Sequence, residues 1–475
     1  MNVLRKIQQG IRPEKAPEID LTWVDEFINN VRPYIFVRTE DNLLIKRPNQ
    51  AQKLNATGAK ILQSLLDGQS IQTLLKNLGP HPQRTVDVAN FLYAVRQQLE
   101  GRLDPFTTNP AVEVQPFDMA FSDYPVLSEI AVTYRCNLKC SFCYAGTGRT
   151  NNPTHSSQEM SAAEIKEVLW KIFHQARVPS VSFSGGEPTL VPELPTLIRY
   201  AKELGMRVNL ITNGTLITQD MANNLADHGL DSAQVSLEGV NAETHDMIVG
   251  QTGAYAKTLA AVTHLNAAGI LTHTNTTISR ANLAECEQFP RFVKKVLGLE
   301  KFSMNLIIPA GSGALHDRLL VPYREIGHFL ERILDAGKQH GIEFMWYSPV
   351  PVRMFNSITH GLGNKGCSAC DGLLSIGANG DVLPCASYDE SVGNLLREDF
   401  SDIWQSTRAI WYRQKKFAHP ECQKCEHFAI CNGACPLYWR QVGFNELLQE
   451  PCHMKKVHLS PGPSSGRRNT VELRK

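Results

Sequence analysis

The sequence has no large net charge, no long apolar run and no apolar segment near its first residues. Its formal net charge of +1 over 475 residues gives no global attraction to nucleic acid or to an anionic membrane. Because no run of about 18 apolar residues is present, no transmembrane helix is expected. The opening segment MNVLRKIQQG lacks the apolar stretch of a secretory signal, so we expect a cytoplasmic protein.

Disulfide bonds are also not expected. The chain has 12 cysteines, but the cytosol keeps thiols reduced, and clustered cysteines there more often bind metal. Eleven of the 12 fall into three groups, whereas Cys286 stands alone in a helical pattern and is expected to be a packed core thiol. The grouped cysteines therefore predict metal centres.

The length predicts two or three domains. Residues 31–103 read as a small unit in which two strand patterns precede three helical ones, at 34–37, 43–46, 61–66, 71–78 and 86–99. Three further segments are expected to be irregular: a weakly ordered N-terminal extension (1–30) with an amphipathic patch from Leu21 to Ile28, a linker (104–125), and a disordered polar tail (459–475).

Residues 126–350 alternate between strand and helix patterns. The clearest helix, 161–175, begins with a capping box of Ser161 and Glu164. Six β/α repeats predict an α/β fold with a parallel sheet, curled or closed, whose chemistry lies at the carboxyl ends of the strands. The expected strands are 129–134, 181–184, 208–212, 234–237, 273–278 and 303–308.

The first cysteine group follows the first of these strands. Cys136, Cys140 and Cys143 have the spacing C-x3-C-x2-C, with the aromatic Phe142 before the last cysteine. Three thiolates on one loop suit one face of a [4Fe–4S] cluster and leave one iron open, as in a catalytic metal site. A zinc loop is the alternative, but it usually has C-x2-C pairs and four ligands.

These residues resemble the cluster-binding loop of the radical S-adenosylmethionine (AdoMet, SAM) superfamily. The resemblance implies a partial (β/α)6 barrel of the TIM type. It also implies that the open iron chelates the amino and carboxylate groups of AdoMet. Reductive cleavage of AdoMet then gives a 5′-deoxyadenosyl radical that abstracts hydrogen.

Further motifs of this superfamily are matched at the ends of later strands. The GGEP motif is expected near the AdoMet amino group, the TNG turn ends the third strand, and polar contacts to the ribose and carboxylate end the fourth. The residues at these positions are Gly185, Gly186, Glu187, Pro188, Thr212, Asn213, Ser236 and Glu238, with Asn305 and residues 309–311 near the expected adenine pocket. One departure is Val249, where related enzymes often have an arginine near the AdoMet carboxylate; Arg280 is a candidate substitute.

The C-terminal cysteines form two more groups. Taken alone they would also fit a double zinc ribbon. Their spacing, with Gly380-x4-Cys385 and then C-x2-C-x5-C-x3-C, resembles the SPASM domain, which is expected to span 361–458 and to hold two auxiliary [4Fe–4S] clusters. By this resemblance the first auxiliary cluster takes Cys367, Cys370, Cys385 and Cys435, and the second takes Cys422, Cys425, Cys431 and Cys452.

Residues 31–103 resemble the PqqD-like peptide-binding chaperone of pyrroloquinoline quinone biosynthesis, mainly at 54–55, Gly58, 61–62 and 66–68. That fold, a three-stranded sheet with winged helices, implies that an exposed sheet edge takes the leader of a precursor peptide as an added strand. A generic winged-helix remnant without this role is the alternative.

The favoured function is a peptide or protein maturase that makes a thioether or carbon–carbon crosslink, or oxidises a side chain, in a ribosomal precursor. A maturase of the quinohemoprotein amine dehydrogenase type is a narrower guess. A sulfatase-type formylglycine maturase is less favoured, because those enzymes carry an acid after the G-x4-C cysteine and this chain has Ala386. A tetrapyrrole or other small-molecule enzyme and an electron carrier are the remaining alternatives. Flavodoxin or ferredoxin would supply electrons, and the sequence identifies no catalytic acid or base.

Overall fold

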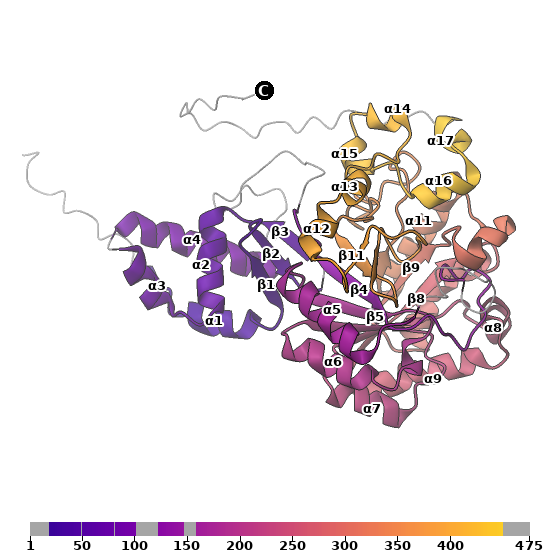
Figure 1. Ribbon diagram of the computed structural model, residues 1–475, viewed down its shortest axis with the longest axis horizontal. Coiled ribbons are helices and arrows are strands. Elements are labelled where there is room, and N and C mark those ends of the chain that lie inside the picture. The colour runs from indigo at the N-terminus through magenta and orange to yellow at the C-terminus, as the bar shows by residue number, and fades with distance from the viewer. Residues whose placement is uncertain (1–18, 49, 80, 101–121, 147–157, 450–475) are drawn as a thin grey trace, which may run out of the picture.

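The computed structural model describes residues 19–48, 50–79, 81–100, 122–146 and 158–449. Figure 1 shows an N-terminal domain beside a larger α/β body, with the cysteine-rich C-terminal region packed on that body. Most of the expected linker and the whole of the expected tail lie outside the described residues. None of the described helices combines the length and apolarity needed to cross a membrane.

The N-terminal domain contains a three-stranded antiparallel sheet in the order β1-β2-β3, and helices pack against one face of it. Asn55 and Ser70 start two of these helices by accepting hydrogen bonds from Gly58 N and Thr73 N. Apolar residues at alternate positions of β1 and β2, among them Val37 and Leu44, join the same core. The elements are α1 (Val24–Val31), β1 (Ile35–Arg38), β2 (Leu43–Lys46), β3 (Gln50–Lys53), α2 (Ala56–Leu66), α3 (Ile71–Leu78) and α4 (Pro82–Leu99).

One expectation about this region is wrong. The amphipathic patch expected within a weakly ordered extension is the well-formed helix α1, whose residues Val24 and Ile28 are buried in the core of the domain. Its apolar face could be recognised from the sequence, but its partners come from helices that follow much later in the chain. The domain therefore begins before residue 31.

A buried ion pair fastens the N-terminal domain to the chain that leads into the body. Arg38, at the end of β1, and Asp41, in the turn before β2, form a bidentate pair with both distances 2.8 Å and both side chains fully buried. Arg38 Nη1 also donates to Pro125 O at 2.7 Å, and Asp41 Oδ2 accepts from Asp123 N at 3.1 Å. These contacts hold the segment immediately before the first strand of the body.

The body is built on a parallel sheet in which all six expected strands are present. Two differences matter: a seventh β/α strand, β10, extends one end, and β11 from the cysteine-rich region pairs in parallel with β4 at the other. The strand order is β10-β9-β8-β7-β6-β5-β4-β11-β12-β13. The bounds are β4 (Leu127–Ala131), β5 (Ser180–Ser184), β6 (Arg207–Thr212), β7 (Ser232–Ser236), β8 (Leu271–Ile278), β9 (Lys301–Leu306), β10 (Glu343–Trp346), β11 (Leu373–Ile376), β12 (Asp381–Leu383) and β13 (Gly393–Asn394).

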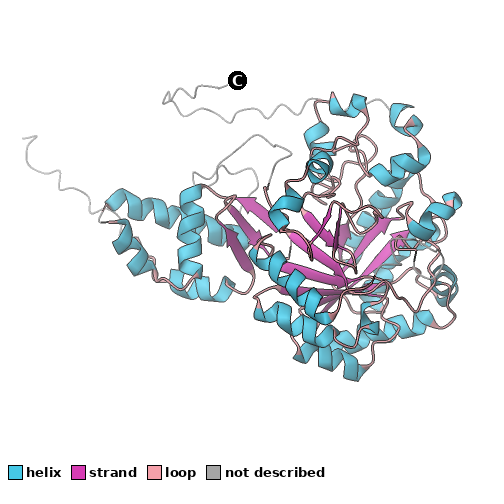
Figure 2. Ribbon diagram, viewed as in Figure 1, coloured by secondary structure: helices cyan, strands magenta, loops and turns pink. Residues whose placement is uncertain are grey.

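Helices follow the strands and cover the outer face of the sheet (Figure 2). The expected capping box is confirmed at α5, where Ser161 Oγ accepts from Glu164 N and Glu164 Oε2 accepts from Ser161 N. Cys286 is fully buried, as expected, and its thiol donates to Asn282 O. The helices are α5 (Ala162–His174), α6 (Leu194–Glu203), α7 (Gln219–Asp227), α8 (Ala242–Val249), α9 (Ala254–Ala267), α10 (Phe289–Lys295) and α11 (Tyr323–His340).

The cysteine-rich region is continuous with the body rather than separate from it. Its strand β11 lies beside β4, and α5 binds it through Lys171 Nζ, which donates to Leu395 O at 2.7 Å. Its short helices are α12 (Phe400–Trp404), α13 (Thr407–Arg413), α14 (Pro420–Gln423), α15 (Phe428–Cys431), α16 (Pro436–Val442) and α17 (Asn445–Gln449).

Replacing Arg38 by Ala is expected to lower the free energy of unfolding by about 3 kcal/mol, because it leaves the buried Asp41 carboxylate without its partner. Urea unfolding under anaerobic conditions measures this loss. The matched control is Arg408→Ala, which breaks the exposed Arg408–Glu390 pair and should cost less than about 1 kcal/mol. Equal losses in the two variants would contradict the role assigned to Arg38.

Candidate active site

The first cysteine loop follows β4 and is held by backbone hydrogen bonds from two directions. Lys139 N donates to Val249 O at 3.0 Å, at the end of α8, and Ser312 N donates to Cys143 O at 2.8 Å from the loop after β9. Cys136, Cys140 and Cys143 are all partly exposed, as is Phe142 within the loop. The loop is therefore fixed to the carboxyl-terminal side of the sheet.

Val249, which stands where related sequences often have arginine, has an apolar role in this structure. It packs with Leu138 and Ala254, and Cys136 and Cys140 lie against this small cluster. The candidate substitute Arg280 pairs with Glu325 at 2.5 Å. The structure thus commits Arg280 to another partner, and an apolar wall adjoins the cysteines.

Two thiols of the loop lie in surroundings that disfavour a free thiolate. Burial raises the pKa of the Cys136 thiol, and burial together with the neighbouring Cys143 raises that of Cys140 well above its usual value. Bound iron offsets such a rise, because a coordinating thiol is deprotonated outright. Among the described residues, no three His, Cys, Asp or Glu side chains converge on a single metal ion. The donor set here is three thiols, which is the chemistry of an iron–sulfur cluster with one open iron.

The GGEP segment closes against the start of the cysteine loop. Gly186 N donates to Thr133 O and Glu187 N donates to Arg135 O, both at 2.8 Å. Gly185 has φ +136°, and a Cβ there would lie 2.2 Å from Thr133 O, so only glycine allows this approach. Pro188 is buried in the short 3-10 turn η2 (Pro188–Leu190) that follows.

Glu187 joins two of the motifs through its carboxylate. It is fully buried, and Oε1 accepts from Thr212 Oγ1 at 2.7 Å while Oε2 accepts from Asn213 N at 2.8 Å. Oε1 also accepts from the backbone and hydroxyl of Thr189. Asn213 Nδ2 in turn donates to Asn137 Oδ1, inside the cysteine loop. The carboxylate therefore sets the relative positions of the GGEP segment, the TNG turn and the cysteine loop.

The fourth-strand motif contains a second buried carboxyl group. Burial raises the pKa of Glu238 to about 8, although its Oε2 accepts from Thr277 N at 2.8 Å. Glu238 N donates to Nδ1 of His245, and burial lowers the pKa of this imidazole to about 4. Ser236 ends β7 beside Asn275, whose Nδ2 donates to Asn305 Oδ1 at 2.8 Å. These polar residues lie along the carboxyl ends of β7, β8 and β9.

In the C-terminal region, the structure gathers Cys367, Cys370, Cys385 and Cys435. Burial raises the pKa of Cys385 well above its usual value, and Cys367 and Cys435 raise it further; burial also brings the pKa of Cys370 and of Cys435 to about 12. The buried Lys415 donates to Cys367 O at 2.6 Å. These thiols are neighbours although 68 residues separate the first from the last.

The remaining C-terminal cysteines line a separate cavity of about 260 Å³. Cys422, Cys425 and Cys431 form part of its wall, together with Leu447 and Leu448 of α17. Cys452 lies outside the described residues, just beyond this helix.

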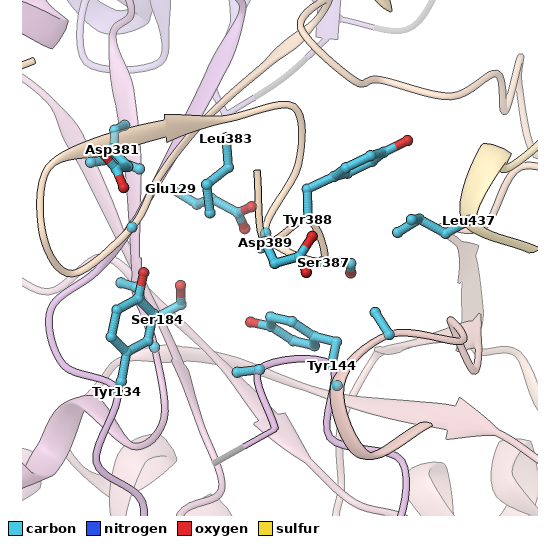
Figure 3. A pocket seen from close by; sticks show the side chains of 18 of the residues that line it. Glu129, Tyr134, Tyr144, Ser184, Asp381, Leu383, Ser387, Tyr388, Asp389 and Leu437 are labelled. Carbon is cyan, nitrogen blue, oxygen red and sulfur yellow. The ribbon is translucent and has the colours of Figure 1, made fainter. Parts of the chain in front are cut away.

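A second cavity, also of about 260 Å³, lies between the sheet and the cysteine-rich region (Figure 3). Its wall includes Gly185 of the GGEP motif and residues 309–311 on one side, and Tyr388 and Arg440 on the other. Sequence reasoning did not identify its acidic residues. They are Glu129, Asp381 and Asp389.

Two family profiles match the chain in the regions just described. The profile of the "Radical SAM superfamily" matches residues 130–293, and that of the "Iron-sulfur cluster-binding domain" SPASM matches residues 367–426. The chain contains a radical SAM domain and a SPASM domain, and it is an enzyme. It therefore uses AdoMet and a [4Fe–4S] cluster, with auxiliary iron–sulfur clusters in the SPASM domain.

The radical SAM enzymes most similar to this chain have several activities. The AdoMet-dependent heme synthase of Methanosarcina barkeri is 28% identical over 70% of this chain and 97% of its own length. The PqqA peptide cyclase of Rhizobium meliloti is also 28% identical, over 66% of this chain and 82% of its own. The crystal structure of Streptococcus suis SuiB bound to the precursor peptide SuiA superposes with a TM-score of 0.62 at 17% identity, covering 86% of this chain and 95% of that one.

The SuiB likeness extends into the N-terminal domain. Residues 101–475 make up only about 79% of the chain, whereas the superposition covers 86%. The shared fold therefore includes part of residues 1–100 in addition to the barrel and the SPASM domain.

Replacing Glu187 by Ala is expected to weaken AdoMet binding by at least about tenfold, because the donors of Thr189, Thr212 and Asn213 lose a charged acceptor. Equilibrium dialysis of the reconstituted enzyme against labelled AdoMet measures the affinity. Glu193→Ala is the control, since Glu193 is exposed and caps no helix through its side chain. Unchanged affinity in Glu187→Ala with intact iron content would refute this coupling.

Proposed function

We propose that this radical SAM enzyme modifies a side chain in a ribosomally made precursor peptide or protein, by a thioether or carbon–carbon crosslink or by oxidation. The observation that carries the proposal is the N-terminal domain, which is fastened to the chain leading into the barrel through Arg38 and whose edge strand β3 has a partner on one side only among the described residues. The peptide cyclase among the relatives and the peptide-bound SuiB structure support the same substrate class.

We infer the following cofactor sites. The reduced cluster of the radical SAM domain supplies the electron that cleaves AdoMet to a 5′-deoxyadenosyl radical. Its ligands are Cys136, Cys140 and Cys143, and the GGEP segment, Thr212, Asn213, Ser236 and Glu238 surround AdoMet. The auxiliary ligands are Cys367, Cys370, Cys385 and Cys435 for one cluster, and Cys422, Cys425, Cys431 and Cys452 for the other. A flavodoxin or ferredoxin is the proposed electron donor.

The edge strand β3 offers main-chain groups for an added peptide strand. In the described residues β3 pairs only with β2. Leu54, directly after β3, donates its N–H to Asn42 O at 2.7 Å and so points toward β2. In an antiparallel pair the N–H groups of alternate residues point to the same side, so those of residues 52 and 50 also face β2. The N–H of Ala51 faces the other way, toward the side of β3 that has no strand partner among the described residues. A leader added there would draw affinity from main-chain hydrogen bonds.

A tetrapyrrole substrate is the second candidate, because heme synthases are among the relatives. The Methanosarcina enzyme is matched over 70% of this chain and the Rhizobium peptide cyclase over 66%, so this coverage does not separate the two substrate classes. The fold of the peptide-bound SuiB, which extends into the N-terminal domain, supports the peptide. A peptide substrate gives the N-terminal domain a role, and a small molecule does not. The sulfatase-type alternative stays disfavoured by Ala386.

The triple variant Cys136→Ala, Cys140→Ala, Cys143→Ala is expected to abolish 5′-deoxyadenosine formation, since no iron can then chelate AdoMet. It should lose about four of about twelve iron atoms. The paired variant Cys422→Ala, Cys425→Ala should keep some uncoupled AdoMet cleavage and lose product. Chromatography of 5′-deoxyadenosine and iron analysis are the measurements. Reductive cleavage by the triple variant would overturn the assignment of the catalytic cluster.

Replacing Ala51 by Pro is expected to weaken binding of a precursor leader at least about tenfold, because proline removes the N–H on the open edge and leaves the bonds to β2 intact. Fluorescence anisotropy of a labelled precursor peptide with the full-length enzyme measures the affinity. Ala51→Val, which keeps the N–H and adds similar bulk, is the matched control. If both variants bind the leader like wild type, β3 is not the docking edge.

A further inference from the structure

Glu129 occupies a position in the sheet that directs a carboxyl group toward the substrate cavity. It lies in β4, and its neighbour Ser128 is fully buried and donates to Ser180 O, on β5. Side chains alternate between the two faces of a strand, so Glu129 points to the opposite face from Ser128. Figure 3 shows its carboxyl group and the Tyr144 hydroxyl on opposite sides of the same space.

Two donors from the SPASM domain hold this carboxyl group in place. The Ser375 hydroxyl, on β11, donates to Glu129 Oε1, and the backbone N–H of Ala386 donates to the same carboxyl group. Burial raises the pKa of Glu129, while these two hydrogen bonds oppose the rise. A carboxyl group whose pKa is moved toward neutrality and whose position is fixed suits proton transfer.

The other titratable groups around the cavity are less suited to accept a proton. Asp381 is engaged on both oxygens, with Asn394 Nδ2 at 2.9 Å and Asn379 Nδ2 at 2.7 Å. Asp389 is exposed. Burial raises the pKa of Tyr134, Tyr144 and Tyr388, so all three stay protonated. Arg440 is a cation and has no acceptor.

We propose that Glu129 is the proton acceptor for the reacting residue of the substrate, which carries a thiol, hydroxyl or ammonium group into this cavity. The proposal rests on the proposed function for the peptide nature of the substrate. In the step, the bond from the proton to the substrate heteroatom breaks and an O–H bond forms on Glu129. The electron pair stays on the heteroatom, so the step needs no oxidant or reductant.

A proton acceptor for the substrate is needed for product formation but not for the cleavage of AdoMet. The hydrogen bonds described for Glu129 come from Ser375 and Ala386 of the SPASM domain, whereas those described for Glu187 come from Thr189, Thr212 and Asn213. Losing the basicity of Glu129 should therefore stop product formation while AdoMet is still cleaved. A peptide that depends on the β3 edge for binding should also bind as before.

Glu129→Gln is the decisive variant, because it keeps the size of the side chain and an acceptor oxygen for the Ser375 hydroxyl while it removes the basic carboxylate. Product formation is expected to fall by about 100-fold or more, whereas 5′-deoxyadenosine formation and peptide affinity change less than about threefold. Glu129→Asp, which keeps a carboxylate, should recover part of the lost product. Mass spectrometry, chromatography and anisotropy on one enzyme preparation give the three readouts, and iron analysis checks the clusters.

Four outcomes decide whether Glu129 has this role. If Glu129→Gln forms product at a rate within about tenfold of wild type, the proposal is wrong. It is also wrong if Asp389→Asn loses product formation and Glu129→Gln does not. If the wild-type enzyme converts a tetrapyrrole and no peptide, the proposed peptide function is wrong. The role of Glu129 is then tested separately, by comparing Glu129→Gln with wild type on the tetrapyrrole. A parallel fall of 5′-deoxyadenosine and product in Glu129→Gln makes Glu129 structural and also overturns the proposal.

Discussion

The pairing of β4 on both of its edges is the constraint on which the rest of this structure depends. On one side β4 pairs with β5 of the barrel, and on the other with β11 of the SPASM domain, both in parallel. The chain before β4 is held by the buried Arg38–Asp41 pair, and the chain after it becomes the catalytic cysteine loop. One short strand thus places the N-terminal domain, the barrel, the cysteine-rich region and the cavity beside Glu129 relative to one another.

Features with a local or periodic signal were predictable from the sequence. The six barrel strands and the capping box at Ser161 follow from patterns within a few residues of each other, and the GGEP and TNG segments lie at the strand ends where parallel topology puts them. The same holds for Cys286, whose apolar surroundings are set by its own helical segment. The spacing of the cysteines carried the assignment to the radical SAM and SPASM families.

Features that depend on distant parts of the chain were not predictable. β11 reads as a short apolar segment, and nothing nearby indicates that it will pair with β4, almost 250 residues earlier. Helix α1 has an apolar face without a visible partner. Glu129 looks like an ordinary polar residue in an alternating strand until Ser375 and Ala386 are brought to it. The position after Cys385 has no acid in the sequence, but in space the Glu129 carboxyl group meets its backbone.

The shared sheet also bears on how the enzyme is assembled in the cell. The cavity-lining residues between Ile376 and Leu383 lie between Cys370 and Cys385, two of the proposed ligands of one auxiliary cluster, and those from Ala386 to Asp389 follow Cys385 directly. Binding of a cluster to these cysteines would fix the position of the segment that lines the cavity and of β11, the strand that pairs with β4 of the barrel. If these cysteines are the ligands, the insertion of the iron–sulfur cluster and the formation of the cavity beside Glu129 occur in the same step of the enzyme's maturation.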